Sequence, residues 1–207
     1  MKRIRIAVID DHAVVRMGLK YALGIFKDLE FAGEHSDGNG AAEFVGQVRP
    51  DVLLLDIRMP GKDGIAALKE ILSVFPDQKV VMLTTAGTEE DVYQSLSLGA
   101  RGYVMKDSAP NNIVDAVRAV ALGGSYVPQE IQDLYDARKE SPCLTPREHE
   151  ALTLLSKGLS NREIASRLGI SEDGAKIHLK HVNEKLGAKD RVDAVAIGIR
   201  RGLVRSV

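Results

Sequence analysis

Residues 52–61 constrain the fold of this chain more than any other stretch, and they read Val-Leu-Leu-Leu-Asp-Ile-Arg-Met-Pro-Gly. Four apolar residues in a row are typical of a strand buried on both faces of a sheet. The run ends at Asp56, and the Met-Pro-Gly that follows turns the chain. In an open parallel sheet, ligands bind beyond the carboxyl ends of the strands. Asp56 is therefore either a functional acid or a solvated carboxylate that ends a strand, and the rest of the chain has to decide between them.

The first 122 residues alternate between patterns typical of strands and patterns typical of helices. Strands are predicted at residues 4–9, 29–34, 52–56, 79–83 and 102–105. Helices are predicted from apolar residues at helical spacing, over residues 15–26, 41–48, 65–75, 89–98 and 111–122. This alternation predicts a flavodoxin-like α/β domain, in which a five-stranded parallel sheet of order 2-1-3-4-5 carries helices on both faces.

Polar side chains follow the ends of four of these predicted strands, namely Asp10 and Asp11, Asp56, Thr84 and Lys106. The carboxyl ends of parallel strands meet at one edge of a sheet, where three close carboxylates would repel one another. A divalent cation relieves that repulsion, and Mg²⁺ prefers oxygen ligands. A carboxylate beside Mg²⁺ and a lysine can attack a phosphoryl group and become an acyl phosphate. Each residue alone could be an ordinary surface residue, but five at matched strand ends favour such a site.

With these residues, positions 3–122 resemble the receiver domain of bacterial two-component response regulators. The resemblance rests on Asp10-Asp11, on residues 55–61, on Leu83-Thr84-Thr85 and on residues 102–106, Gly-Tyr-Val-Met-Lys. It implies that a partner histidine kinase phosphorylates Asp56. It also implies that the domain itself catalyses phosphoryl transfer to this aspartate and hydrolysis from it, without being an enzyme in the usual sense.

The same resemblance implies a Mg²⁺ site. Asp11, Asp56 and the backbone carbonyl of Arg58 would bind the ion, and Asp10 would act through water. Lys106 and the ion would neutralise phosphoryl oxygens in the transition state. The cofactor expected for this chain is therefore Mg²⁺.

A switch pair is also implied, formed by Thr84 and Tyr103. In receivers the hydroxyl moves toward the phosphoryl group, and the aromatic ring turns inward behind it. From the residues alone, Tyr103 would be a half-buried packing residue. The chain departs from the commonest receiver pattern at Asp107, where many receivers have proline. Arg58 and Ala86 stand at positions where receivers tune the lifetime of the acyl phosphate.

Charge is spread unevenly along the chain, although its formal net charge is only -1. Residues 143–207 hold 12 Lys and Arg against 8 Asp and Glu, an excess of +4, whereas residues 1–124 hold 14 against 17. An acidic first part and a basic last part suggest two domains, with nucleic acid as a candidate partner of the second. We therefore expect a receiver domain over 1–124, a linker over 125–142 and a DNA-binding domain over 143–207. The linker contains a candidate helix around 129–138 that could dock on either domain.

Four helices are predicted after the linker. Thr145 with Glu148, and Ser160 with Glu163, are capping boxes that begin the first two helices. Ser171 caps a third helix that runs to residue 186, and a fourth covers residues 190–200. A short helix and a tight turn before a longer helix describe a helix-turn-helix unit.

The third of these helices has two distinct faces at 100° per residue. One face carries the residues predicted for the core, Ala175, Leu179, Val182 and Leu186. The opposite face, flanked by Lys176, carries Ile177, Lys180, His181 and Glu184. Lysines with an exposed isoleucine suit a major groove, where they meet guanine edges, phosphates and thymine methyl groups. By pattern alone, a solvated face with ordinary charges is an equal alternative.

Residues 144–203 resemble the carboxyl-terminal DNA-binding domain of the LuxR/FixJ/NarL group. The matching segments are residues 144–148, 158–165, 176–181 and 185–187. The resemblance implies base contacts from Lys176, Ile177 and Lys180, and the expected DNA-binding set adds His181, Ser160 and Asn161. The group usually has Thr-Val where this chain has Gly174-Ala175, and that threonine often touches a phosphate. A glycine in the first turn also costs up to about 1 kcal/mol of helix stability.

The sequence thus predicts a transcriptional response regulator that is activated by a sensor histidine kinase through Asp56. It is expected to bind double-stranded promoter DNA with two half-sites as a homodimer, paired through residues 192–199. We expect a cytoplasmic protein without a membrane partner, because no apolar run approaches 18 residues and the start is a strand rather than a signal peptide. The single cysteine excludes an intramolecular disulfide.

Two alternatives remain. A haloacid dehalogenase-type phosphatase also uses a strand-end aspartate, but its chemistry needs a second acid two residues later, where this chain has Arg58. A phosphorylation-independent regulator would keep the receiver only for dimerisation, and the complete acidic cluster argues against it.

Overall fold

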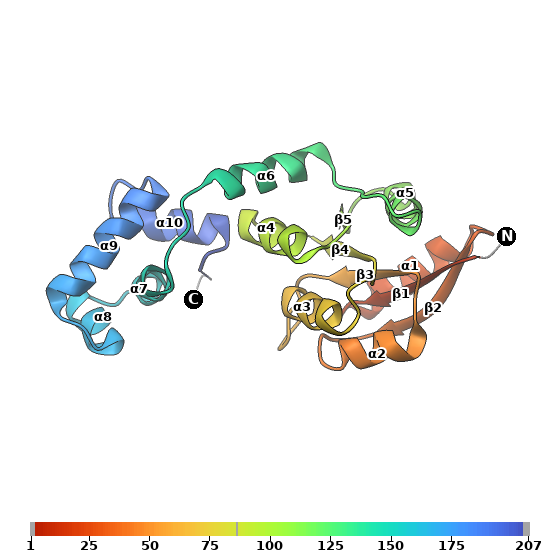
Figure 1. Cartoon of the computed structure of the whole chain (residues 1–207), viewed down its shortest axis with the longest axis horizontal. Helices are drawn as coiled ribbons and strands as arrows, with labels where there is room; N and C mark the ends of the chain where they lie inside the picture. Colours follow the sequence, from red (N-terminus) through yellow and green to blue (C-terminus); the bar gives the residue numbers. More distant parts are fainter. Residues whose placement is uncertain (1–2, 86, 205–207) are drawn as a thin grey trace. The chain divides into compact units, whose positions relative to one another are not determined.

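The structure, a computed structural model, describes residues 3–85 and 87–204. The chain divides into two compact units (Figure 1). The first comprises residues up to 87 together with 91–135, and the second comprises residues 136 onward together with 88–90. Each unit has its own buried apolar residues. Among the described residues, no helix is both long and apolar enough to cross a membrane.

The strands of the first unit form one parallel sheet in the order β2-β1-β3-β4-β5. Their bounds are β1 Ile4–Ile9, β2 Leu29–His35, β3 Val52–Asp56, β4 Val80–Thr84 and β5 Gly102–Met105. The helices are α1 Ala13–Gly24, α2 Ala41–Val48, α3 Gly64–Val74, α4 Glu89–Leu98 and α5 Pro110–Ala121. The predicted fold and strand order are therefore confirmed.

Alternate side chains of each strand enter two separate apolar layers, because successive residues of a strand point to opposite faces. Ile6 and Val8 pack with residues of α1 and α5 on one face. Ala7 and Ile9 pack with residues of α2, α3 and α4 on the other face. All five residues of β3 are buried, and each buried leucine contributes about 1.5–3 kcal/mol. This burial fixes the end of β3, and with it Asp56, at the rim of the sheet.

The segment after α5 packs on the first unit. The backbone N–H of Tyr103 donates to the carbonyl oxygen of Tyr126, and the N–H of Tyr126 donates to the carbonyl oxygen of Arg101, each at 2.9 Å. Helix α6, Gln129–Glu140, buries Ile131 in the same layer as α3 and α4. The ring of Tyr135 stacks on that of Tyr93 in α4 with centroids 5.7 Å apart. The first half of α6 therefore docks on the receiver-like unit, a choice that the sequence left open.

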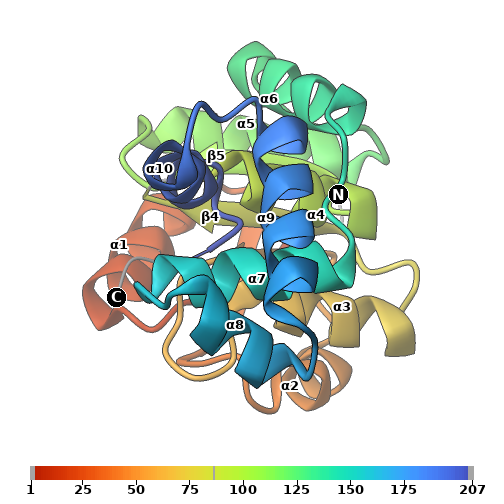
Figure 2. The same cartoon turned by 90° about the vertical axis from the view of Figure 1, so that its left-hand side faces the viewer.

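The second unit is helical, as predicted. Its helices in the described residues are α7 Pro146–Ser156, α8 Asn161–Leu168, α9 Glu172–Leu186 and α10 Arg191–Arg201. Both predicted capping boxes are present, at Thr145 with Glu148 and at Ser160 with Glu163. Helix α9 packs against α7, α8 and α10 (Figure 2), and its predicted core stripe is buried. One long helix is thereby held on three neighbours while its remaining face stays in solvent.

Candidate functional site

The carboxyl ends of β1 and β3 bring two buried carboxylates to one lysine. The side chains of Asp10 and Asp56 are inaccessible to solvent. The ammonium nitrogen of Lys106, just after β5, lies 2.8 Å from Oδ2 of Asp10 and 2.7 Å from Oδ2 of Asp56. Lys106 is itself only 7% exposed. The strand-end residues that the sequence singled out therefore lie together at one rim, with one cation between two acids.

Backbone donors fix the two acids further. The N–H of His12 donates to Oδ1 of Asp10 at 2.8 Å, and the N–H of Arg58 donates to Oδ1 of Asp56 at 3.2 Å. Burial raises the pKa of the Asp56 carboxyl above its ordinary value; Lys106 lowers this pKa and Asp10 raises it again. Burial first, and then the charge of Asp10, thus make ionisation of Asp56 costly, and a further cation would relieve that cost.

The donor set fits a divalent metal ion. Asp10, Asp11, His12 and Asp56 each offer one ligand atom, and these atoms lie within 4.8 Å of one another. One oxygen of each of the three carboxylates is buried and has a nitrogen atom at ion-pair distance, Nζ of Lys106 for Asp10 and Asp56 and Nδ1 of His12 for Asp11. Three carboxylates form a hard-oxygen set of the kind Mg²⁺ prefers. Sequence reasoning did not include His12, whose Nδ1 lies 2.8 Å from Oδ1 of Asp11.

The expected switch residues lie on neighbouring strands: Thr84 is the last residue of β4 and Tyr103 is the second residue of β5. Thr84 is fully buried. Tyr103 is fully buried too, since its ring lies in the apolar layer with residues of α3 and α4. The half-buried position expected from the residues alone is therefore wrong. Its hydroxyl oxygen finds no hydrogen-bond partner in the described part of the chain. A Cβ placed on Gly87 would lie 2.1 Å from that oxygen. Ala86, also expected to modulate the site, lies outside the described residues.

An ion pair that the sequence reasoning missed joins this site to α4. The guanidinium of Arg58 donates to Oδ2 of Asp91, which stands 33 positions later in the first turn of α4. Burial raises the pKa of the Tyr103 phenol, the Asp91 carboxylate raises it further, and Arg58 lowers it. The pair therefore lies near the switch ring. No local pattern pairs these residues, because their contact depends on how α4 packs.

The exposed face of α9 carries the expected DNA contacts. Ile177 is 55% exposed, and Lys176, Lys180 and His181 are exposed as well. The helix begins where Oγ of Ser171 accepts a hydrogen bond from the N–H of Gly174 at 3.1 Å. The helix start is therefore formed in spite of the glycine.

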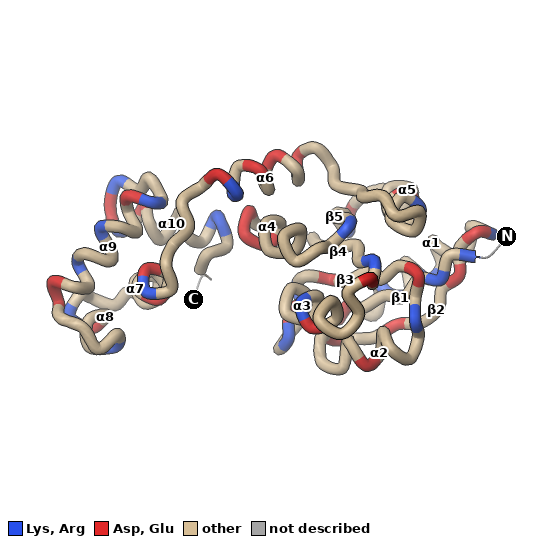
Figure 3. The backbone as a smooth tube through the Cα atoms, in the orientation of Figure 1, with Lys and Arg blue, Asp and Glu red and all other residues tan. Residues whose placement is uncertain are grey.

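Acidic residues of the same helix accompany both lysines. The ammonium nitrogen of Lys176 lies 3.1 Å from Asp173 and 3.6 Å from Glu172, and that of Lys180 lies 3.7 Å from Glu184. Figure 3 shows acidic and basic positions interspersed along α9. The hydrogen bond to Asp173 raises the pKa of Lys176. A phosphate would have to compete with these carboxylates for the lysines.

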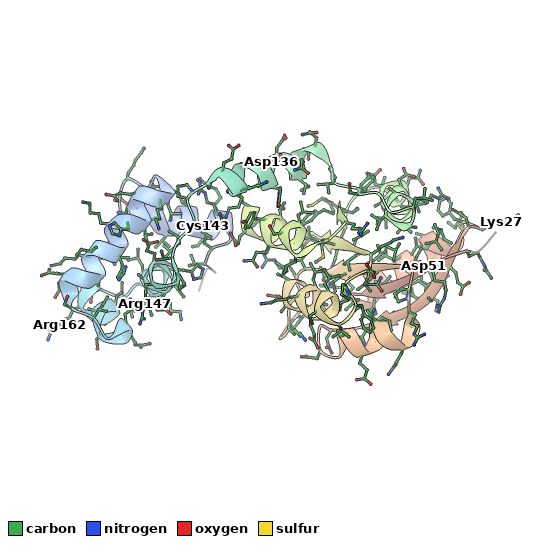
Figure 4. The ribbon with its side chains drawn as sticks, in the orientation of Figure 1. Lys27, Asp51, Asp136, Cys143, Arg147 and Arg162 are labelled. Atoms are coloured by element: carbon green, nitrogen blue, oxygen red, sulfur yellow. The ribbon has the colours of Figure 1, made fainter. Side chains whose placement is uncertain are left out.

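The remaining expected DNA contacts lie at the start of α8. Ser160 is engaged in its capping box, since Oγ donates to Oε2 of Glu163 at 2.6 Å and accepts from the Glu163 N–H at 3.4 Å. Asn161 is the first residue of α8 and is partly buried. Arg162, which follows, and Arg147 in α7 are exposed side chains of the helical unit (Figure 4). Ser160 thus has a structural task besides any contact with DNA.

Glu148 connects the first helix of this unit to α9. The residue is 4% exposed; Oε2 accepts from the N–H of Thr145 at 2.7 Å and lies 2.7 Å from the ammonium nitrogen of Lys185. Oε1 lies 3.7 Å from Nδ1 of His181. The sequence predicted only the capping contact, because the contacts with α9 span at least 33 residues of chain and depend on packing.

Known protein families match both parts of the chain. Residues 6–118 match the response regulator receiver domain, and residues 142–197 match the bacterial regulatory proteins of the luxR family. The uncharacterized transcriptional regulatory protein YxjL of Bacillus subtilis is 36% identical over 98% of both chains. The nitrate/nitrite response regulator NarL of Escherichia coli is 33% identical over 91% of this chain and 92% of its own.

Among solved structures, RcsB from Salmonella enterica serovar Typhimurium, bound to a promoter with the phosphomimetic BeF₃⁻, is 26% identical. It covers 95% of this chain and 98% of its own, with a TM-score of 0.74. A receiver match followed by a luxR-family match agrees with the order of the two units observed here, a parallel sheet with helices followed by a helical unit. This chain belongs to the NarL/FixJ-type two-component response regulators, transcription regulators that join a receiver to a LuxR-type DNA-binding domain and are not enzymes in the usual sense.

Proposed function

We propose that Asp56 accepts a phosphoryl group from a sensor histidine kinase. The observation that carries the proposal is the single ammonium of Lys106 between the buried carboxylates of Asp10 and Asp56. A carboxylate oxygen of Asp56 attacks the phosphorus of a phosphohistidine. The new P–O bond forms as the P–N bond breaks, and the electron pair returns to the imidazole nitrogen. Lys106 stabilises the negative charge on the phosphoryl oxygens.

The acidic residues would hold Mg²⁺ beside the acceptor. Asp11, Asp56 and the backbone carbonyl of Arg58 are the proposed ligands, with Asp10 acting through water. When bound, the ion supplies positive charge for the transferring phosphoryl oxygens. The gathering of ligand atoms from these three carboxylates within 4.8 Å of one another supports this assignment.

The proposed switch consists of Thr84 and Tyr103. The hydroxyl of Thr84 donates a hydrogen bond to the phosphoryl group, and the Tyr103 ring occupies the apolar layer behind it. Hydrolysis of the acyl phosphate by the receiver itself returns the switch to rest. The complete burial of both side chains supports the pairing.

The output is binding of double-stranded promoter DNA. The proposed contacts are Lys176, Ile177, Lys180 and His181 of α9, with Ser160 and Asn161 at the start of α8. We propose that the chain forms a homodimer when it is phosphorylated or DNA-bound, and that this dimer binds two half-sites. The proposed location is the cytoplasm. The functional division would be a receiver over 1–124, a linker over 125–142 and a DNA-binding domain over 143–207.

Phosphorylation is tested by incubating the full chain with Mg²⁺ and phosphoramidate and measuring the intact mass. We expect one acid-stable, base-labile phosphoryl adduct on the wild type and none on Asp56→Asn. Asp51→Asn, at the opposite end of β3, serves as a control and should still be phosphorylated (Figure 4). Absence of the adduct from the wild type, or its persistence in Asp56→Asn, would favour a regulator that does not depend on phosphorylation.

A further inference from the structure

Arg58 makes one contact through its backbone and another through its side chain. Its N–H donates to Oδ1 of Asp56, so the residue is attached to the proposed acceptor. Its guanidinium reaches across to Asp91 in the first turn of α4. One residue therefore connects the acceptor with the helix that packs over the same sheet face as Tyr103.

The two partners of this ion pair differ in their access to water. The side chain of Arg58 is 43% exposed, whereas that of Asp91 is 10% exposed. The guanidinium is consequently the partner that is able to move, while the carboxylate is held with α4. Loss of the guanidinium would remove a charge-assisted contact from a nearly buried carboxylate, which is more costly than loss of a contact in water.

A phosphoryl group on Asp56 would be a second anion for the same guanidinium. Phosphate carries more charge than a carboxylate, and arginine binds its oxygens in a forked geometry. Arg58 stands two residues after the acceptor, on the loop that follows β3, so its long side chain starts close to any phosphoryl group on Asp56. The new anion therefore competes with Asp91 rather than adding to it.

We propose that Arg58 is shared between Asp91 and the phosphoryl group on Asp56. In the unphosphorylated protein it holds the first turn of α4, and on phosphorylation it leaves Asp91 and releases that turn. The inference rests on the proposed function of Asp56 and specifies how its charge reaches α4. It assigns to Arg58 a positioning and signalling task that its backbone carbonyl alone would not have.

Competition makes a prediction that a merely structural ion pair does not. BeF₃⁻ with Mg²⁺ serves as the phosphoryl probe, and its affinity is measured by ¹⁹F NMR of the full chain. Asp91→Asn should bind BeF₃⁻ about two- to fivefold more tightly than the wild type, because the partly exposed guanidinium no longer has a competing anion. Arg58→Ala should bind it more weakly, and adding Asp91→Asn to Arg58→Ala should change nothing further.

Asp115→Asn is the matched control, because it removes an exposed carboxylate from α5 of the same unit. Its BeF₃⁻ affinity should equal that of the wild type. Unchanged or weaker binding by Asp91→Asn, or the same tightening in the Arg58→Ala background, would overturn the shared-guanidinium proposal. If the wild type does not bind BeF₃⁻ at Asp56, the proposed function fails and this inference fails with it.

Amide hydrogen exchange supplies a second measurement, and its main comparison is the wild type with and without BeF₃⁻. Saturating BeF₃⁻ should accelerate exchange of the backbone amides in the second turn of α4, which donate to the carbonyl oxygens of the first turn. In Arg58→Ala the same amides should already exchange rapidly and respond little to the probe. Exchange that BeF₃⁻ leaves unchanged in the wild type would contradict the release of α4.

Discussion

A Cβ on Gly87 would stand 2.1 Å from the hydroxyl oxygen of Tyr103, well inside van der Waals contact. The inward position of the Tyr103 ring therefore requires glycine at position 87. The ring fills the apolar layer between the sheet and its helices, so it has little room to retreat while remaining inside. Gly87, on the loop before α4, thus helps to determine where the ring of Tyr103 in β5 lies.

Gly87→Ala is expected to expel the Tyr103 ring or to strain the site, at a cost of about 1–3 kcal/mol in the free energy of unfolding. The physical reason is overpacking against a rigid aromatic side chain. Nitration with tetranitromethane, located by peptide mass spectrometry, should modify Tyr103 in the variant and spare it in the wild type. Gly18→Ala is the control, because a Cβ at position 18 meets nothing within 4 Å. The prediction would be contradicted if Tyr103 were equally protected from nitration in the Gly87→Ala and Gly18→Ala variants and the two were equally stable.

Protonation of Glu148 in acid should make the helical unit less stable. Burial raises its pKa, but Lys185 and Thr145 favour the ionised form more strongly, so the pKa lies below the ordinary value of 4.5. A carboxyl whose pKa is lower in the folded state contributes its full stabilisation at pH values above its pKa in the unfolded state. That contribution is lost as the pH falls through the pKa of the folded state. Glu148→Gln should therefore reduce stability at neutral pH and flatten its dependence on pH below about 4.5.

Hydrogen exchange in α7 and α9 as a function of pH measures this effect. Glu150→Gln is a suitable control, because Glu150 forms an exposed ion pair with Arg147, and such pairs contribute about 0–1 kcal/mol. Similar pH profiles for the Glu148→Gln variant and the wild type would show that Glu148 does not couple ionisation to folding.

Lys180→Ala should weaken DNA binding and lower its dependence on salt. If Lys180 neutralises one phosphate, the slope of log K against log salt falls by about 1. Fluorescence anisotropy with promoter fragments at several salt concentrations gives that slope. Lys69→Ala, on α3 of the receiver unit, should leave both quantities unchanged, and a Lys180→Ala slope equal to that of the wild type would remove Lys180 from the phosphate contacts.

Gly174→Ala should stabilise α9 by up to about 1 kcal/mol, since alanine favours a helix more than glycine does. The nearest atom to the added methyl group is Oγ of Ser171 at 3.3 Å, a contact that a small shift of that side chain relieves. Thermal unfolding followed by circular dichroism measures the gain. Gly187→Ala is an opposite control, because φ of +66° disfavours alanine there, so that variant should lose stability.

The order of elements was predictable because local patterns report local structure. The apolar run of β3 indicated a strand buried on both faces, and Ser160 with Glu163 indicated a helix start. Both patterns depend on residues close in sequence, so the tertiary structure had little freedom to change them. Parallel topology then brought Asp56 and Lys106 to one rim, since the ends of parallel strands share an edge.

The sequence by itself determined two domains, a parallel sheet and the rim on which the acids and Lys106 meet. Only the tertiary structure decided that Tyr103 lies wholly inside, that Arg58 pairs with Asp91 and that Glu148 reaches Lys185. It also decided that Ile131 carries the first half of α6 onto the receiver unit. These choices escape the sequence because periodicity tells which face of an element is buried, whereas the partner met there depends on how distant elements pack.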